Sequence, residues 1–237
     1  MKTLAVEGLE AGYGKIAIVH GIDLVAAAGK ITALIGANGA GKTTTLKAIA
    51  GLLEGTRGAM RLGSDSFNGL ASNRRVELGV ALVPEGRMVF PTLSVDENLV
   101  LGAIVPRARA TMSERRAEMY ELFPKLAERK RQAAGSLSGG EQQMLAIARG
   151  LMSRPSVMLL DEPTLGLSPL MAELVFGIVE RLRSEGLTIL MAEQNVHRTL
   201  EIADNAWVLE QGRIAFSGPA ESARNDPRVR EAYLGTG

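Results

Sequence analysis

The stretch GANGAGKTT, residues 36–44, follows the apolar run KITALI and opens a segment of good helix formers. It fits the pattern G-x-x-x-x-G-K-[ST] between a predicted strand and a helix predicted to begin at about Gly41. Glycines let backbone N–H groups face a polyphosphate, and a helix start adds partial positive charge. The stretch therefore predicts a nucleoside triphosphate site within an α/β fold.

Two side chains of this loop have specific expected roles. Lys42 should reach the β- and γ-phosphates, and Thr43 should supply a hydroxyl to Mg²⁺. The alternative is a purely structural glycine turn before a helix. The full predicted nucleotide-binding set in this loop is Gly36, Ala37, Asn38, Gly39, Ala40, Gly41, Lys42, Thr43 and Thr44.

A second motif, VMLLDEP at residues 157–163, ends an apolar run in two adjacent acids. A buried strand ends in carboxylates where cations or waters meet them, and ligands bind at strand ends of such sheets. We expect Asp161 to hold Mg²⁺ and Glu162 to polarise the attacking water. The alternative is a solvated loop after a strand.

Composition excludes several classes of protein. The chain has 237 residues, of which 46% are hydrophobic and 22% charged, with a net charge of +1 and no cysteine. The absence of cysteine excludes disulfides and thiolate metal sites. The near-neutral charge and the 4% aromatic content argue against a nucleic-acid partner. We expect no membrane-spanning segment, because no apolar run approaches the ~18–20 residues required.

The order of segments predicts one mainly parallel sheet with a helical insert. Strand-like patterns lie at residues 3–24, 30–36 and 80–84, and strand and helix alternation resumes after residue 154. Between them, a capping box of Ser94 and Glu97 begins a helix. Charged helical sequence interrupted by Pro124 follows. Apolar strands between helices indicate a sheet covered on both faces.

The segment LSGGEQQ, residues 137–143, raises a separate question. Ser138 and Glu141 form a second capping box, which accounts for helix initiation but not for the adjacent glycines Gly139 and Gly140. Glycines at a helix start expose backbone donors to an anion. We interpret the segment as a second anion site, offered to a nucleotide held by another copy or a paralogue.

These three motifs, with LSGGEQQ lying between the phosphate loop and VMLLDEP in the chain, resemble the ABC-type ATPases, and the resemblance covers essentially the whole chain. It implies a P-loop NTPase fold with a mainly parallel core sheet, an N-terminal antiparallel β-subdomain and an α-helical subdomain insert. It also implies a single domain, residues 1–237. Its nucleotide-binding core would be residues 1–85 and 149–237, and its helical subdomain residues 86–148.

The resemblance further implies how ATP is bound. Two ATPase chains would pair head to tail, and Ser138, Gly139 and Gly140 of one chain would contact in trans the ATP held by the other. Tyr13 would stack on adenine, although its spacing fits a core or turn residue equally well. ATP and Mg²⁺ are the expected cofactors.

Three positions depart from the broad ABC pattern: Glu85 replaces the usual Gln, Ser168 the usual Asp and Gln194 the usual His. Glu85 would place an extra carboxylate near Mg²⁺ as a ligand. Gln194 would be a catalytic residue that positions the reacting groups, because its neutral amide can donate hydrogen bonds but cannot take up a proton as an imidazole can. With VPEGR, PTLGLSP, EQN and VREAYLG, these departures resemble the LivF-type ATPases of branched-chain amino-acid importers. The ATPase of urea and short-amide importers is the alternative.

The resemblance implies a motor subunit that hydrolyses ATP to ADP and phosphate on the cytoplasmic face of the cell membrane, as a peripheral subunit. Its partners would be a second ATPase, as a homodimer or a heterodimer with a paralogue, two membrane permeases and, indirectly, an extracytoplasmic binding protein. The helical insert and the loop of residues 85–91 would receive a permease helix, with Met88, Val89 and Phe90 as an exposed apolar patch. A permease-free ABC ATPase and a soluble phosphotransferase are less favoured.

Overall fold

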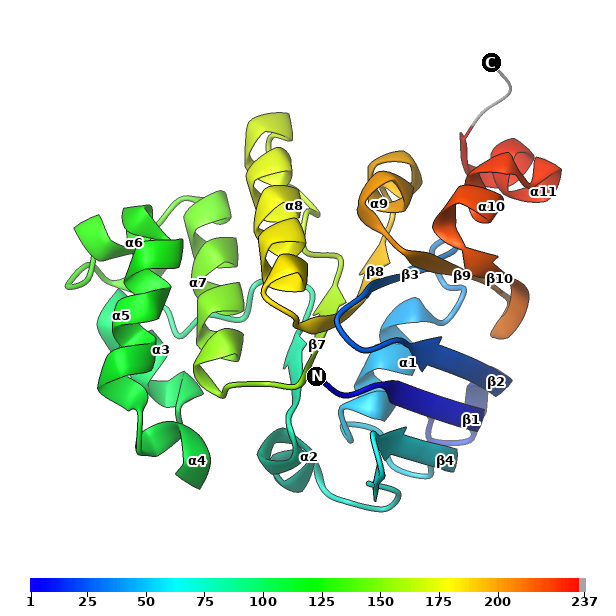
Figure 1. The fold of residues 1–237 in the computed structure, drawn as a ribbon, viewed down its shortest axis with the longest axis horizontal. Coiled ribbons are helices and arrows are strands. Elements are labelled where there is room, and N and C mark those ends of the chain that lie inside the picture. The colour runs from blue at the N-terminus through cyan, green and yellow to red at the C-terminus, as the bar shows by residue number, and fades with distance from the viewer. Residues whose placement is uncertain (235–237) are drawn as a thin grey trace.

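Two β-sheets organise the chain in the computed structural model, which describes residues 1–234 (Figure 1). The larger sheet has the strand order β10-β9-β3-β8-β7-β6. All neighbouring pairs in it are parallel except β9 and β10, which confirms the predicted mainly parallel sheet. Its strands are β3 (Ile31–Ile35), β6 (Val80–Val83), β7 (Val157–Asp161), β8 (Thr188–Glu193), β9 (Asn205–Glu210) and β10 (Arg213–Pro219).

The smaller sheet is antiparallel throughout and has the order β2-β1-β4-β5. Its strands are β1 (Leu4–Tyr13), β2 (Ile16–Ala26), β4 (Arg57–Leu62) and β5 (Asp65–Ser66). This confirms the antiparallel N-terminal subdomain. The strands β4 and β5 follow the phosphate loop in sequence, so the subdomain is completed by a segment that our strand assignments did not include.

Both faces of the larger sheet are buried, as its apolar strands predict. In β7, Met158 and Leu160 join one hydrophobic cluster, whereas Val157 and Leu159 join another, and all four are 0% exposed. Consecutive strand residues point to opposite faces, so each cluster covers one face. The helices outside the insert are α1 (Lys42–Ile49), α2 (Ser72–Leu78), α8 (Pro169–Ser184), α9 (Val196–Ile202), α10 (Ala220–Asn225) and α11 (Pro227–Val229).

A group of helices lies between β6 and β7 in sequence and at one end of the molecule (Figure 1). Both predicted capping boxes are confirmed: Ser94 and Glu97 begin α3, and Ser138 and Glu141 begin α7. Pro124 separates α5 from α6, as predicted. The helices are α3 (Val95–Gly102), α4 (Pro106–Arg109), α5 (Met112–Leu122), α6 (Pro124–Glu128) and α7 (Gly139–Met152).

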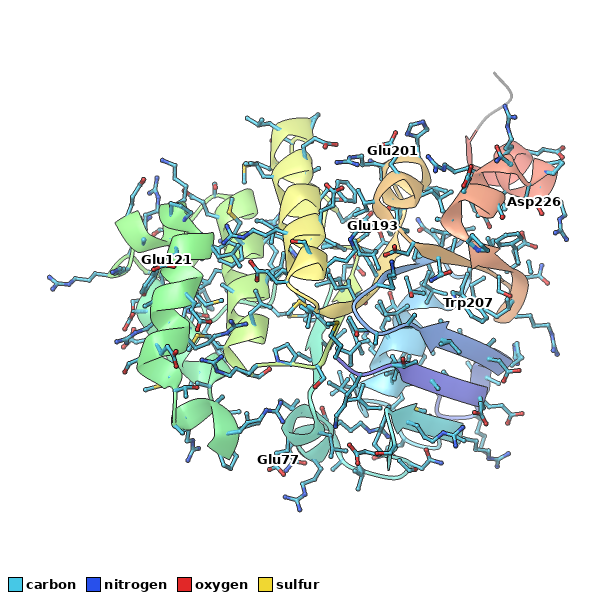
Figure 2. All side chains as sticks on the ribbon, in the orientation of Figure 1. Glu77, Glu121, Glu193, Glu201, Trp207 and Asp226 are labelled. Atoms are coloured by element: carbon cyan, nitrogen blue, oxygen red, sulfur yellow. The ribbon has the colours of Figure 1, made fainter. Side chains whose placement is uncertain are left out.

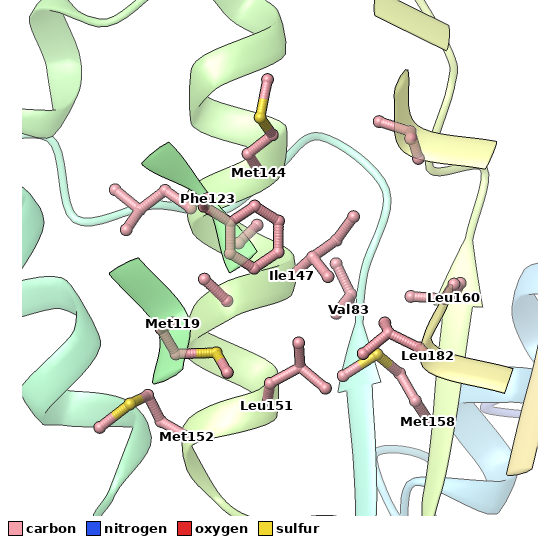
Figure 3. Close-up of a cluster of buried hydrophobic side chains, with 14 of the residues drawn as sticks. Val83, Met119, Phe123, Met144, Ile147, Leu151, Met152, Met158, Leu160 and Leu182 are labelled. Atoms are coloured by element: carbon pink, nitrogen blue, oxygen red, sulfur yellow. The ribbon is translucent and has the colours of Figure 1, made fainter. Parts of the chain in front are cut away.

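The helical group shares a core with the sheet (Figure 3). Met119 and Phe123, near the end of α5, and Leu151 of α7 belong to the same buried cluster as Val83 of β6 and Leu160 of β7. Helix α7 runs to Met152, beyond the predicted subdomain boundary at residue 148. The division into a core of residues 1–85 and 149–237 and a helical subdomain of residues 86–148 therefore stays a prediction.

Within residues 1–234, none of the helices combines the length and apolar character that crossing a bilayer requires. Of the C-terminal motif VREAYLG, Gly235 lies outside the described residues, as do the last two residues of the predicted domain.

Candidate functional site

The phosphate loop joins β3 to α1 and depends on its glycines. Gly39 and Gly41 have φ values of 80° and 109°, which side-chain-bearing residues rarely adopt. A Cβ atom on Gly36 would overlap the carbonyl oxygen of Leu209. Gly41 precedes α1 without any side-chain cap, so the first N–H groups of the helix have no side-chain acceptor from the cap position. The loop therefore presents bare donors at a positive helix end, as an anion site requires.

Lys42 lies beneath this loop and contacts Glu162. Its Nζ donates to the carbonyl oxygen of Gly36 at 2.8 Å and lies 3.3 Å from Glu162 Oε1. Both side chains are about 5% exposed. The pair brings together two motifs that lie far apart in the sequence.

Thr43 and Asp161 form a second contact between the same motifs. Thr43 Oγ1 donates to Asp161 Oδ1 at 2.9 Å, while Asp161 Oδ2 is buried without a hydrogen-bond partner. Burial raises the pKa of Asp161, and the charge of Glu85 also raises it, although the hydrogen bond from Thr43 acts against both. The carboxylate thus has one free oxygen, next to a hydroxyl, at the end of β7.

Glu162 follows β7 in a strained backbone conformation. Its φ of 48° lies in the left-handed region, and its N–H donates to the carbonyl oxygen of Ala192 at 2.9 Å. Burial raises the pKa of Glu162, Lys42 opposes this shift, and the charge of Glu193 adds to it. Its Oε2 is buried without a hydrogen-bond partner. A non-glycine residue with positive φ at such a position is a frequent feature of functional sites.

Ten of the predicted site residues line one pocket of about 380 Å³. Asp161 does not line the pocket but accepts a hydrogen bond from Thr43, which does; Gly36, Ala37 and Ala40 belong to the loop without lining the pocket. Tyr13 ends β1 and is 48% exposed beside it. The ten are Tyr13, Asn38, Gly39, Gly41, Lys42, Thr43, Thr44, Glu85, Glu162 and Gln194.

The signature residues do not line this pocket. Ser138 caps α7 and is exposed, and a Cβ atom on Gly140 would overlap the side chain of Met171 in α8. A Cβ atom on Gly139 would lie 2.8 Å from Nη2 of Arg87. Packing inside the chain thus gives both glycines a role that the sequence argument did not consider.

Two residues of the site escaped the sequence analysis. Ile18 of β2 is an apolar residue that lines the same pocket as Tyr13. Glu193 ends β8 and is 1% exposed. Its signal was present, since LTILMAE ends an apolar strand in an acid, just as VMLLDE does.

Comparison with known proteins gives consistent matches. The ABC transporter family matches residues 19–165, and the branched-chain amino acid ATP-binding cassette transporter family matches residues 213–237. The high-affinity branched-chain amino acid transport ATP-binding protein BraG of Pseudomonas aeruginosa is 45% identical, over 94% of this chain and 95% of its own. The probable branched-chain amino acid transport ATP-binding protein LivF of Archaeoglobus fulgidus is 40% identical, over 96% of both chains.

Two solved structures are similar over the full length of both chains. A nucleotide-free ATP-binding cassette from an ABC transporter superposes with a TM-score of 0.87 and 26% identity. The ADP conformation of the ATP-binding cassette MJ1267 superposes with a TM-score of 0.86 and 26% identity. The chain therefore has the fold of these ATP-binding cassettes.

The raised pKa of Asp161 predicts the effect of removing its charge. A carboxyl whose pKa is higher in the folded than in the unfolded chain destabilises the fold once ionised, so stability falls as pH rises through that interval. Without nucleotide and with EDTA, Asp161→Asn should raise Tm by ~2–4 °C for each 1 kcal/mol gained. The gain should be larger at pH 8 than at pH 5, measured by thermal unfolding.

Asp204 is the matched control, because its pKa shift has the opposite sign. Burial acts to raise the pKa of Asp204, but the Ile31 N–H and Lys30 outweigh it and the net shift is downward. Asp204→Asn should therefore lower Tm under the same conditions. If Asp161→Asn lowered Tm as well, the Asp161 carboxylate would be a net stabilising group and the interpretation would be wrong.

Proposed function

The chain belongs to the ATP-binding subunits of ABC transporters and is therefore an ATPase, and from that premise we propose that it drives the import of branched-chain amino acids. The observation that carries the substrate class is the match of residues 213–237 to the branched-chain family. The 45% identity to BraG over nearly the whole of both chains supports the same assignment.

ATP binds in this proposal at the pocket around the phosphate loop. The bare N–H groups at the start of α1 and the ammonium group of Lys42 would hold the phosphates. Tyr13 and Ile18 offer an apolar surface beside them for the adenine ring. The placement of Tyr13 at the rim of the pocket, half exposed, favours stacking over a core role.

Mg²⁺ would be held by Thr43 and Asp161, with Glu85 as a third candidate ligand. The unpartnered buried Oδ2 of Asp161 supports this, since such an oxygen is costly unless a cation or water meets it. Hydroxyl and carboxylate oxygens are the ligands that Mg²⁺ prefers. When bound, Mg²⁺ would offset charge on the phosphates. The exposed Glu85 lines the same pocket and acts on Asp161 through its charge.

Glu162 would polarise the attacking water and accept its proton. Its raised pKa brings the carboxylate closer to the working pH, which favours a general base. Gln194 is exposed at the rim of the pocket and would position the reacting groups as a neutral donor. Lys42 would hold the terminal phosphate beside Glu162, given that the two side chains already lie in contact.

The signature segment would act on the nucleotide of a second ATPase chain. Ser138, Gly139 and Gly140 lie outside their own chain's pocket, which supports a contact in trans. The second chain would be another copy or a paralogue, paired head to tail. Gly139 packs against Arg87 and Gly140 against Met171. This packing is compatible with a contact in trans, because Ser138 itself remains exposed.

A groove of about 650 Å³ is the proposed docking site for a membrane permease. It lies between α2 and β6 on one side and α3 and α7 on the other. Leu52, Phe90, Leu101 and Ile104 line it and are 41–63% exposed. An apolar patch of this kind marks an interaction site. Docking there would hold the chain peripherally at the cytoplasmic face of the membrane, and an extracytoplasmic binding protein would deliver the amino acid to the permeases.

Of the apolar patch expected at residues 88–90, Met88 and Phe90 are exposed, by 63% and 48%. Val89 is instead half-buried against the core beneath the helices, so the expectation was wrong for this residue. The groove extends the patch with residues from α3 that sequence alone did not connect to it.

Glu162→Gln tests the proposed hydrolysis. The amide keeps the size of the side chain but cannot accept a proton, so the ATPase rate should fall by about 100-fold to 10,000-fold. ATP should remain bound, which equilibrium binding with labelled ATP measures. The control Glu185→Gln removes an exposed charge elsewhere and should leave the rate unchanged. Parental turnover of Glu162→Gln would exclude Glu162 as the base.

Ser138→Phe tests the contact in trans. It should strongly reduce hydrolysis while the ATP affinity of the dilute single chain stays near the parental value, because Ser138 lies outside that chain's pocket. Ser94→Phe is the matched control, since it removes the same kind of capping box from α3 at a cost of about 1 kcal/mol. An equal loss of hydrolysis in both variants would assign the effect to helix capping instead.

Ile104→Glu tests the groove. A charge among its apolar residues should prevent co-purification of the two permeases with the tagged chain. Val25→Glu places the same charge on the antiparallel sheet at a site that is 44% exposed and should leave the complex intact. Recovery of permeases by both variants in equal yield would place the docking site elsewhere.

A further inference from the structure

Glu193 is a buried carboxylate beside the proposed catalytic residues that has no role in the proposal so far. It ends β8 and is 1% exposed. Figure 2 shows it between α8 and α9, within the body of the molecule. The parallel register pairs Asp161 of β7 with Ala192 of β8, so Glu162 and Glu193 follow at the same edge of the sheet. Burial of a second carboxylate next to Glu162 is unfavourable unless its hydrogen bonds offset the cost.

Those hydrogen bonds connect two separate loops. Glu193 Oε1 accepts from the N–H of Thr164 at 2.9 Å and from its hydroxyl at 2.6 Å. Glu193 Oε2 accepts from the N–H of Gln194 at 3.0 Å and, at a longer 3.4 Å, from that of Asn195. The two carboxylate oxygens therefore bind two different loops. Oε1 binds the loop that follows Glu162, and Oε2 binds the loop that contains Gln194.

The loop after Glu162 needs such restraint. Glu162 has a φ of 48°, and a strained residue of this kind persists only where its surroundings over-determine the backbone. The Glu162 N–H bonds to Ala192, directly before Glu193, and Thr164 bonds to Glu193 itself. The end of β8 thus fixes the backbone on both sides of the strained turn.

We propose that Glu193 is a positioning residue for ATP hydrolysis, which holds the Glu162 turn and the Gln194 loop in one fixed arrangement. The inference rests on the proposed roles of Glu162 and Gln194. A carboxylate suits this task because it is an acceptor only, with lone pairs for all four donors. Its charge also makes each bond stronger than a neutral one. A glutamine at position 193 would replace one of these oxygens with an NH₂ group, which would face N–H donors and could not accept their hydrogen bonds.

Kinetics of the full chain, assembled with its partner ATPase chain and supplied with Mg–ATP, test the proposal. Glu193→Gln and Thr164→Val should each lower kcat by about 10-fold to 100-fold, the scale of misplaced catalytic groups, with little change in KM or in ATP affinity. Thr164→Ser keeps the hydroxyl and should restore kcat. The kcat of the double variant Glu193→Gln/Thr164→Val should be only slightly lower than that of Glu193→Gln alone, because both changes disrupt the same hydrogen-bonded link between Thr164 and Glu193.

Thr199→Val is the matched control, because it removes a buried hydroxyl of α9 that has no hydrogen-bond partner. It should leave kcat unchanged. Unaltered kcat in Glu193→Gln, additive losses in the double variant, or a fall in ATP affinity equal to that in kcat would each overturn the proposal. Because Thr164→Val changes a half-buried loop residue, it keeps the test valid if Glu193→Gln does not fold.

Hydrogen exchange separates this inference from the proposed function. In the chain without nucleotide, Glu193→Gln should speed amide exchange in peptides covering residues 162–168 and 193–197, whereas Thr199→Val should not. Faster exchange in Glu193→Gln, combined with no ATPase activity of the parental chain even when it is assembled with its partner ATPase and permeases, would refute the proposed function and leave the hydrogen-bonded link through Glu193 intact. Unchanged amide exchange in these peptides of Glu193→Gln would refute the proposed restraint of the two loops by Glu193, whatever the ATPase rate.

Discussion

The site is built around three buried carboxylates at the ends of two neighbouring parallel strands, and the rest of the structure must accommodate their burial. Asp161, Glu162 and Glu193 are each at most 6% exposed, and among the described residues only Lys42 forms an ion pair with any of them. Burial is the main reason that the pKa values of Asp161 and Glu162 are raised; the charge of Glu85 adds to the shift of Asp161, and the charges of Glu193 and Asp161 add to that of Glu162. Ile35 of β3 pairs with Glu193 of β8 in parallel register, so the phosphate loop that follows β3 begins at the same edge of the sheet as the three carboxylates.

The sequence predicted the parts of the site that are coded by local pattern. The phosphate loop, the acids after β7 and both capping boxes each depend on residues within about ten positions, where glycine, charge and apolar runs have direct physical meaning. Glu193 was missed although it ends a strand in the same way, because its importance lies in contacts with Thr164, which is 29 residues away. The strands β4 and β5 were missed for a similar reason. They complete a sheet begun before the phosphate loop, and short polar strands have little pattern of their own.

The two glycines of the signature segment show where sequence reasoning was incomplete. The sequence pattern predicts only an anion site there, whereas in the structure Gly139 makes room for the Arg87 guanidinium and Gly140 makes room for Met171. Both neighbours belong to loops or helices next to the pocket motifs: Arg87 is two residues from Glu85, and Met171 follows the turn that Glu162 begins. The start of α7 is therefore fitted against the same segments that surround the pocket. The proposed role toward a partner's nucleotide and the packing role inside the chain would act through the same few residues at the start of α7.

The loop of residues 85–90 joins the pocket to the groove through a short, restrained path. Glu85 lines the pocket and Phe90 lines the groove. Asn98 of α3 fixes Phe90 by hydrogen bonds to its N–H and its carbonyl oxygen, at 2.9 and 3.1 Å. Arg149 of α7 donates to the carbonyl oxygen of Met88 at 2.6 Å and lies over the Phe90 ring. Because α3 and α7 hold one end of this loop and its other end borders the pocket, the loop connects the groove to the pocket, and any coupling of binding at the two places through it is reciprocal.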